Sequence, residues 1–170
     1  RVAIARAGIA NHAELNVVPR NLAASVPDGV SDEEAAFGTV GAVAMHAVRN
    51  AEVRLGEVVA VLGCVLVGQI AARLLTLSGC RVICLDYNPE RLKLATEWGA
   101  EQALDLAKDG VEMNIREMTQ GCGADAIVIA AATESSEPFD TAAVIARDRA
   151  RVVMVGMTGT AFPYAGFMKK

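Results

Sequence analysis

Two glycines and one acid have a spacing that indicates a definite chemistry. Gly63 and Gly68 follow the apolar run from Val58 to Leu62, and Asp86 stands at the end of the next apolar run. A buried strand, a tight glycine turn, a helix whose N-terminus faces a pyrophosphate and an acid for the ribose together bind dinucleotides. The sequence therefore predicts a dinucleotide site formed by Gly63, Val65, Leu66, Val67, Gly68 and Asp86.

Val65 stands where this pattern has its middle glycine. That glycine lets the pyrophosphate touch backbone amides at the start of the helix. A β-branched side chain places methyl groups in this approach. We expect Gly63 to end the strand in a turn that a side chain would crowd and Gly68 to let the helix pack closely on the sheet. We expect Val65 to weaken dinucleotide binding.

Asp86 favours NAD over NADP. A carboxylate at the end of the second strand accepts hydrogen bonds from both hydroxyls of the adenosine ribose. The same carboxylate would repel a 2'-phosphate, and Tyr87 follows it in place of the arginine that often receives such a phosphate. Arg91 falls in the first turn of the next helix, where we expect it to flank the adenosine.

From residue 57 onward, short apolar runs alternate with segments of helical spacing, which is typical of strands buried on both faces by crossover helices. The sequence predicts strands at 57–62, 81–86, 102–105, 126–131 and 151–156. Helices are predicted around Val67 to Leu74, from Asn88 to Trp98, and over 110–119 and 136–146. The expected fold class is therefore α/β, a doubly wound parallel sheet of Rossmann type.

The first thirty residues differ from the rest because they have no core of their own. His12 to Val18 has the pattern of a strand. Ser31 and Glu34 then form a capping box, which predicts a helix that bends at Gly38 or Gly41 and ends near Asn50.

Two further segments near glycines or polar residues have structural interpretations. Gly121 to Gly123 precedes a strand, so we interpret it as the end of a helix and not as a phosphate loop. Glu134 to Glu137 is interpreted as a helix start, in a position where loops after parallel strands line ligand sites.

Several short motifs carry a resemblance to a known family. They are Ala10 to Glu14, Val26 to Ser31, Glu34 to Ala36, Met45 to Val48, Leu55 to Val59, Asp86 to Leu92, Trp98 to Ala100, Gly123 to Asp125 and Val153 to Gly156. With the glycine loop, they resemble the medium-chain dehydrogenase/reductase family over nearly the whole chain, and its zinc-type alcohol and polyol dehydrogenases in Asp86 to Pro89. The resemblance implies an oxidoreductase in which a GroES-like catalytic domain precedes a Rossmann domain, and hydride moves between substrate and NAD.

The resemblance also implies a division of this chain. Residues 1–30 would be a remnant of the catalytic domain, and residues 31–170 a dinucleotide-binding domain truncated at its C-terminal end. The zinc ligands of such an enzyme would lie upstream, so we expect no catalytic residue and no bound zinc here, and an inactive fragment. The cofactor wall would also draw on Val43 to His46, on Ala131, Ala132 and Thr133, and on Gly156 to Thr158. The complete enzyme would take a small-molecule substrate.

Composition excludes several classes of partner. The net charge is -4 over 170 residues with no basic patch, so we expect neither nucleic acid nor an anionic membrane as a partner. No apolar stretch approaches the roughly 20 residues of a membrane span, and we expect a cytoplasmic protein. The four cysteines, Cys64, Cys80, Cys84 and Cys122, have no disulfide or zinc spacing, and we expect buried free thiols.

Two other functions are compatible with much of this pattern. Val65 is compatible with a non-catalytic Rossmann domain that senses nucleotides or serves as a structural partner. A methyltransferase also places an acid after its second strand, but it usually has an acidic first strand, and Val58 to Leu62 has no acid. We also expect Val152 to Val155 to form an open sheet edge, which favours a homo-oligomer.

Overall fold

The computed structural model of the chain describes residues 1–5, 8, 10–11, 13–108, 110–159 and 161–168. The chain forms two compact units, Arg1–Val43 and Ala44–Lys170. The boundary between them falls within helix α2 (Gly38–Asn50).

The first unit contains a small antiparallel sheet. Strand β1 (Val2–Ile4) pairs with β2 (Ala23–Ser25), which follows the 3-10 helix η1 (Arg20–Leu22). The expected strand at residues 12–18 is wrong over Ala13 to Val18, and His12 lies outside the described residues. The side chain of Asn16 instead bonds the backbone of Asn11 at 2.9 Å and of Ala13 at 3.1 Å, a local pattern that competes with a strand.

The predicted capping box begins helix α1 (Asp32–Ala36). The Ser31 hydroxyl accepts a hydrogen bond from the Glu34 amide at 3.1 Å, and the Glu34 carboxylate accepts one from the Ser31 amide at 2.8 Å. Helix α2 starts anew at Gly38, after Phe37. The predicted single helix is therefore divided in two at Phe37, directly before Gly38, one of the two glycines at which a bend was predicted.

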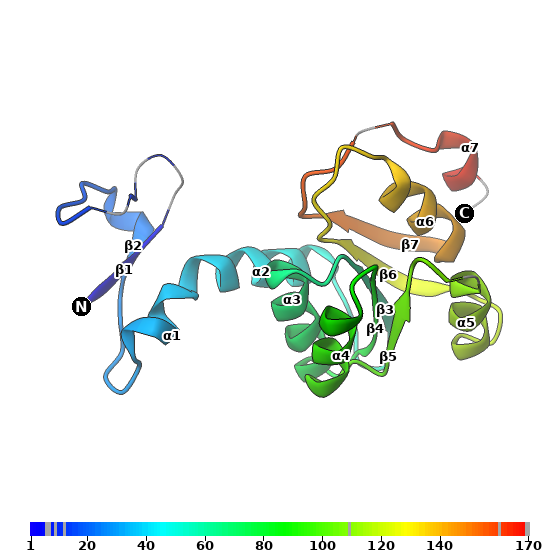
Figure 1. Cartoon of the computed structure of the whole chain (residues 1–170), viewed down its shortest axis with the longest axis horizontal. Helices are drawn as coiled ribbons and strands as arrows, with labels where there is room; N and C mark the ends of the chain where they lie inside the picture. Colours follow the sequence, from blue (N-terminus) through cyan, green and yellow to red (C-terminus); the bar gives the residue numbers. More distant parts are fainter. Residues whose placement is uncertain (6–7, 9, 12, 109, 160, 169–170) are drawn as a thin grey trace. The chain divides into compact units, whose positions relative to one another are not determined.

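The second unit is built on five parallel strands in the order β5-β4-β3-β6-β7. The strands are β3 (Val58–Leu62), β4 (Arg81–Asp86), β5 (Gln102–Asp105), β6 (Ala124–Ile129) and β7 (Ala146–Met154). The helices between them are α3 (Leu66–Leu77), α4 (Pro89–Glu97), α5 (Val111–Met118) and α6 (Glu137–Ile145) (Figure 1). The doubly wound Rossmann fold is confirmed, and its strand order reverses between β3 and β6.

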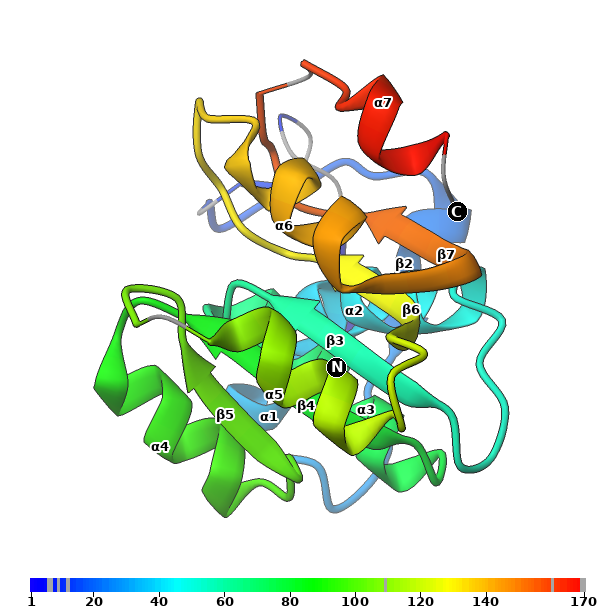
Figure 2. The same cartoon turned by 90° about the vertical axis from the view of Figure 1, so that its right-hand side faces the viewer.

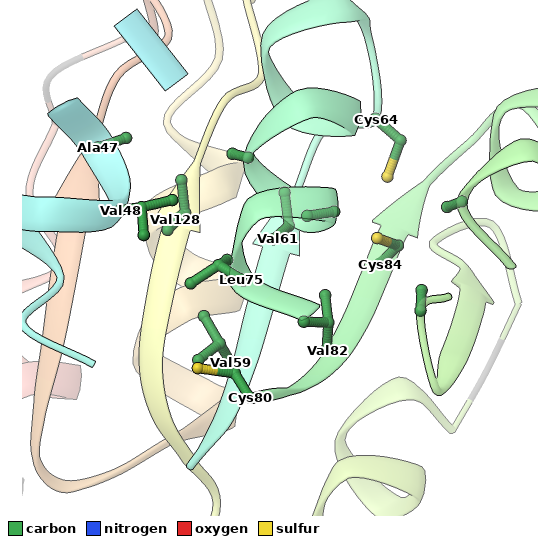
Figure 3. Packing of buried hydrophobic residues seen from close by; sticks show 14 of the residues in the cluster. Ala47, Val48, Val59, Val61, Cys64, Leu75, Cys80, Val82, Cys84 and Val128 are labelled. Carbon is green, nitrogen blue, oxygen red and sulfur yellow. The ribbon is translucent and has the colours of Figure 1, made fainter. Parts of the chain in front are cut away.

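Alternating side chains of β3 divide the core of this unit into two layers. Val59 and Val61 belong to the layer that contains Leu75 of α3 (Figure 3), whereas Leu62 belongs to the layer that contains Ile115 of α5. Figure 2 shows the strands of the sheet side by side, with the α5 and α6 helices in front of them. Because both faces are covered, all five residues of β3 are buried.

The last strand begins earlier than expected, at Ala146. Ala124 pairs with Ala146, but the next paired residues are Ala126 and Arg151, so the residues between bulge out of the ladder and Arg149 takes a φ of 60°. Within the part of the chain that the structure describes, β7 pairs with β6 alone, which leaves it at an edge of the sheet as expected.

A short helix, α7 (Tyr164–Phe167), lies in the tail, for which the sequence predicted no element. The ring of Phe167 stacks on that of Phe162, with ring centroids 4.8 Å apart. None of the helices over the described residues is long and apolar enough to cross a membrane.

The cysteine prediction is confirmed for three residues and wrong for the fourth. Cys64, Cys80 and Cys84 are buried free thiols, and Cys122 is exposed. Cys122 lies in the turn after α5 between Gly121 and Gly123, which both have a positive φ. The Gly121 amide bonds the Arg116 carbonyl at 2.7 Å, so this segment ends the helix, as predicted.

Candidate functional site

A cavity of about 440 Å³ opens where the carboxyl ends of β3, β4 and β6 meet. This is the place at which doubly wound sheets bind ligands, because the strand order reverses there. Eight of the twelve residues expected from the sequence line it: Gly63, Val65, Asp86, Tyr87, Arg91, Ala131, Ala132 and Thr133. The remaining four, Leu66, Val67, Gly68 and Gly156, do not line it.

Gly63 and Gly68 have the structural roles expected of them. Gly63 has a φ of +90°, and a Cβ there would lie 2.6 Å from the backbone nitrogen of Ala131. A Cβ on Gly68 would lie 1.9 Å from the carbonyl oxygen of Gly63. The turn and the helix after it can therefore pack this closely only with glycine at both positions.

Gly156 packs closely against the segment after β6 in a similar way. A Cβ on Gly156 would lie 2.0 Å from the carbonyl oxygen of Ala131, and the Gly156 amide bonds the Ile129 carbonyl at 2.9 Å. The Thr133 amide bonds the Met157 carbonyl at 2.9 Å. The segments after β6 and β7 are thereby joined, which holds Ala131 to Thr133 in place beside the cavity.

Val65 precedes the first residue of α3 and faces the cavity. Its φ of -77° and ψ of -171° are extended backbone, and the residue is 49% exposed. No side chain caps this end of α3, so the first amides of the helix are not satisfied by a capping residue. Leu66 is also exposed, while Val67 packs against the core beneath. The Val65 methyl groups therefore lie beside the helix end that would receive an anion.

Asp86 is held in the floor of the cavity and is only 6% exposed. One carboxylate oxygen accepts a hydrogen bond from the Cys64 amide at 2.7 Å, and the other accepts one from the Asn88 amide at 2.8 Å. Arg91 approaches the second oxygen at 3.5 Å. Since a carboxylate has about four acceptor positions, Asp86 orders the glycine loop and retains capacity for a ligand.

Tyr87 and Glu137 join two walls of the cavity. The Tyr87 hydroxyl donates a hydrogen bond to the Glu137 carboxylate, and both side chains line the cavity. This bond raises the pKa of Tyr87, because the carboxylate stabilises the protonated phenol and opposes a second negative charge. The sequence predicted a helix start at Glu137 but did not identify it as a site residue. Its position in the segment after β6 could have indicated this, because such segments line ligand sites.

The thiols of Cys64 and Cys84 face each other beneath the glycine loop (Figure 3). The hydrogen bond with Cys84, together with burial, raises the pKa of Cys64 far above its usual range. Such a thiol is a core residue and not a nucleophile.

No group of three or more His, Cys, Asp and Glu side chains among the described residues is placed to hold a metal ion. His46 is exposed on α2 and His12 lies outside the described residues.

Comparison with known proteins agrees with this geometry. Residues 67–169 match the model of the zinc-binding dehydrogenase family. An erythritol/L-threitol dehydrogenase from Mycolicibacterium smegmatis is 34% identical over 113 residues, which are 66% of this chain and 31% of the relative. A sorbitol dehydrogenase from Halalkalibacterium halodurans is 32% identical over 105 residues, which are 61% of this chain and 31% of the relative.

A solved alcohol dehydrogenase from Thermus sp. ATN1 superposes with a TM-score of 0.78 at 26% identity, covering 86% of this chain and 44% of that one. The chain spans about a third of the length of the curated relatives it matches. The resemblance found in the sequence is confirmed. The chain belongs to the zinc-binding dehydrogenase family and corresponds to the nucleotide-binding half of the zinc-type medium-chain alcohol dehydrogenases.

Proposed function

We propose that this chain is the NAD-binding domain of an oxidoreductase that transfers hydride between a nicotinamide cofactor and an alcohol, a polyol or a related carbonyl compound. The observation that carries the proposal is the cavity at the strand reversal, with the Asp86 carboxylate fixed 2.7 Å from the Cys64 amide of the glycine turn. This arrangement provides an acceptor for ribose hydroxyls next to a helix N-terminus.

Three groups of residues would hold the cofactor. Asp86 would accept hydrogen bonds from the ribose, and Arg91 and Tyr87 would flank the adenosine. The start of α3 would face the pyrophosphate, beside Val65. Ala131 to Thr133 would form the wall along the rest of the cofactor. When bound, NAD supplies the hydride acceptor or donor.

The names of the relatives support the proposed substrate class. Two of them are named for polyols, erythritol or L-threitol and sorbitol. We propose that residues 1–30 are the end of a preceding GroES-like domain and that the zinc and catalytic residues belong to that domain. The chain by itself would then bind cofactor without turnover.

Calorimetric titration of the chain with NAD and with NADP tests the cofactor assignment. NAD is expected to bind more tightly than NADP, and an Asp86→Ala protein that remains folded is expected to lose most of the NAD affinity. A Val65→Gly protein provides a second test, because it restores the middle glycine. If neither the native chain nor this variant binds NAD at millimolar concentration, the cofactor assignment is wrong.

Val65 also supports a second candidate function, a Rossmann domain that senses a nucleotide or serves as a structural partner. Val65 is 49% exposed beside the helix N-terminus, where the pyrophosphate of a dehydrogenase cofactor would lie. The two functions differ in the full-length protein. Turnover of polyols with NAD supports the dehydrogenase, whereas nucleotide binding without turnover supports the sensor.

The β7 edge supports a further proposal, that the protein is a homo-oligomer. Among the described residues, Val152 to Met154 of β7 pair with β6 alone, and such a strand edge offers backbone donors and acceptors to another chain. Size-exclusion chromatography over a range of concentrations tests this. A monomer at every concentration would refute it.

A further inference from the structure

Tyr87 and Glu137 meet at the mouth of the nucleotide cavity. Tyr87 follows β4, Glu137 is the first residue of α6, and the phenol donates its hydrogen bond to Oε1 of the glutamate. Tyr87 is 54% exposed and Glu137 is also exposed, whereas Asp86 is 6% exposed in the floor of the same cavity. The cavity therefore has one carboxylate in its floor and a second one at its mouth.

Several contacts fix the carboxylate at the mouth. The Tyr87 hydroxyl binds the charged form, and the N-terminal end of α6 favours a negative charge in its first turn. The Ser135 hydroxyl accepts a hydrogen bond from the Glu137 amide at 3.1 Å, which holds the residue at the start of the helix. Among the described residues that line the cavity, Arg91 is the one cation, and it lies 3.5 Å from Asp86.

We propose that Glu137, positioned by Tyr87, is a second determinant of cofactor selectivity that disfavours a 2'-phosphorylated dinucleotide beyond the effect of Asp86. The inference rests on the proposed NAD-binding function. Because Asp86 is buried and Tyr87 follows it in the chain, a ribose held by Asp86 would carry its 2'-substituent on the solvent side of the carboxylate, near Tyr87 and Glu137. A phosphate there carries about two negative charges at neutral pH, whereas the 2'-hydroxyl of NAD carries none.

The expected change in NADP affinity is set by the repulsion between the exposed Glu137 carboxylate and a 2'-phosphate. The repulsion acts across several ångströms at high effective dielectric, so removing the Glu137 charge is expected to change NADP affinity roughly three- to tenfold. The interaction is screened by salt, because the Glu137 side chain is exposed. NAD affinity is expected to stay within about twofold, since the ribose hydroxyls bind Asp86.

The test measures dissociation constants of NAD and NADP for the full chain by calorimetry at low and high salt. Glu137→Gln keeps the size and polarity of the side chain and removes its charge. Glu134→Gln is the matched control, because it removes the same charge from an exposed residue that does not line the cavity. Tyr87→Phe keeps the carboxylates of Asp86 and Glu137 but removes the hydrogen bond that positions Glu137.

Glu137→Gln is expected to tighten NADP binding roughly three- to tenfold at low salt, with a smaller gain at high salt. Tyr87→Phe is expected to shift NADP in the same direction by less, and Glu134→Gln to leave both affinities unchanged. The proposal is overturned if Glu137→Gln leaves NADP binding as weak as in the native chain, or shifts it no more than Glu134→Gln does. NAD binding that persists in this case leaves the proposed function intact. If neither the native chain nor the Val65→Gly protein binds NAD at millimolar concentration, the proposed function is refuted, and the selectivity proposal with it.

Discussion

A Cβ atom on Gly68 would lie 1.9 Å from the carbonyl oxygen of Gly63. The first turn of α3 therefore packs directly on the turn that ends β3. The Gly63 amide also bonds the Leu85 carbonyl at 2.8 Å, which ties this turn to the neighbouring strand. The two glycines are thus required by packing within the sheet, before any ligand binds.

Gly68→Ala is expected to destabilise the fold by about 3 kcal/mol or more, since the new methyl group collides with backbone that cannot move aside cheaply. Urea unfolding followed by circular dichroism measures the change. Gly41→Ala is the matched control, because a Cβ at Gly41 in α2 meets nothing within 4 Å. The control is expected to be neutral or slightly stabilising, as alanine favours a helix. Equal losses in both proteins would contradict the packing account.

Val65→Ala is expected to tighten NAD binding several-fold, because it removes methyl groups beside the start of α3 without adding the backbone freedom of glycine. Val65→Gly removes the same groups and adds backbone freedom. The native φ of -77° suits any residue, so the fold is expected to tolerate both changes. Calorimetry with NAD compares the three proteins. Weaker binding by Val65→Ala would show that the valine contacts the cofactor favourably.

Asp86→Asn is expected to destabilise the fold by roughly 1–3 kcal/mol, apart from any effect on ligand binding. The carboxylate accepts hydrogen bonds from the Cys64 and Asn88 amides, one on each oxygen. An asparagine offers one acceptor oxygen and would turn its own donors toward the other amide. Thermal unfolding without ligand measures the loss. Unchanged stability would mean that the carboxylate does not hold the loop.

The phenol of Tyr87 is expected to titrate above the ordinary tyrosine pKa of about 10, since Glu137 accepts its hydrogen bond. The bond is present in full below that ordinary pKa and is lost as the pH rises through the raised value. Ultraviolet absorbance of the phenolate in a Tyr164→Phe protein isolates Tyr87, because the chain has 2 tyrosines. Adding Glu137→Gln should return the titration to its ordinary position; an identical curve would argue against the bond.

Cys122 is expected to react rapidly with a thiol reagent in the folded protein, while Cys64, Cys80 and Cys84 react only on unfolding. Cys122 is exposed and the other three are buried. Burial also raises the pKa of Cys80, so little of its reactive thiolate forms. Colorimetric counting of thiols before and after denaturant checks this. A Cys122→Ser protein that still reacts rapidly would refute it.

The apolar runs predicted the sheet well because parallel strands are buried on both faces. β4 and β5 have the predicted bounds, and β3 and β6 differ by a few residues at their ends. The start of β7 could not be predicted in this way, since Arg147 to Arg149 are polar and join the strand through a bulge. Local side-chain bonds, such as those of Asn16, likewise override an alternating pattern.

The site was predictable where a motif fixes its geometry. The glycine turn and Asp86 lie where the pattern places them because adjacent parallel strands bring their carboxyl ends together. The contact between Tyr87 and Glu137 joins residues on either side of β3, and nothing local in the sequence pairs them. Cys122 was misjudged because its two glycine neighbours place it in a surface turn.

Packing and ligand binding depend on different residues of the glycine loop. A side chain at Gly63 or Gly68 would clash with neighbouring atoms whatever the ligand, whereas the extended backbone of Val65 accepts any residue. On the proposed function, a substitution at position 65 is therefore expected to change cofactor affinity while the fold stays intact. In other proteins of this fold, the residue at the middle position of the loop is therefore the one to inspect for domains that have kept the fold and changed their ligand binding.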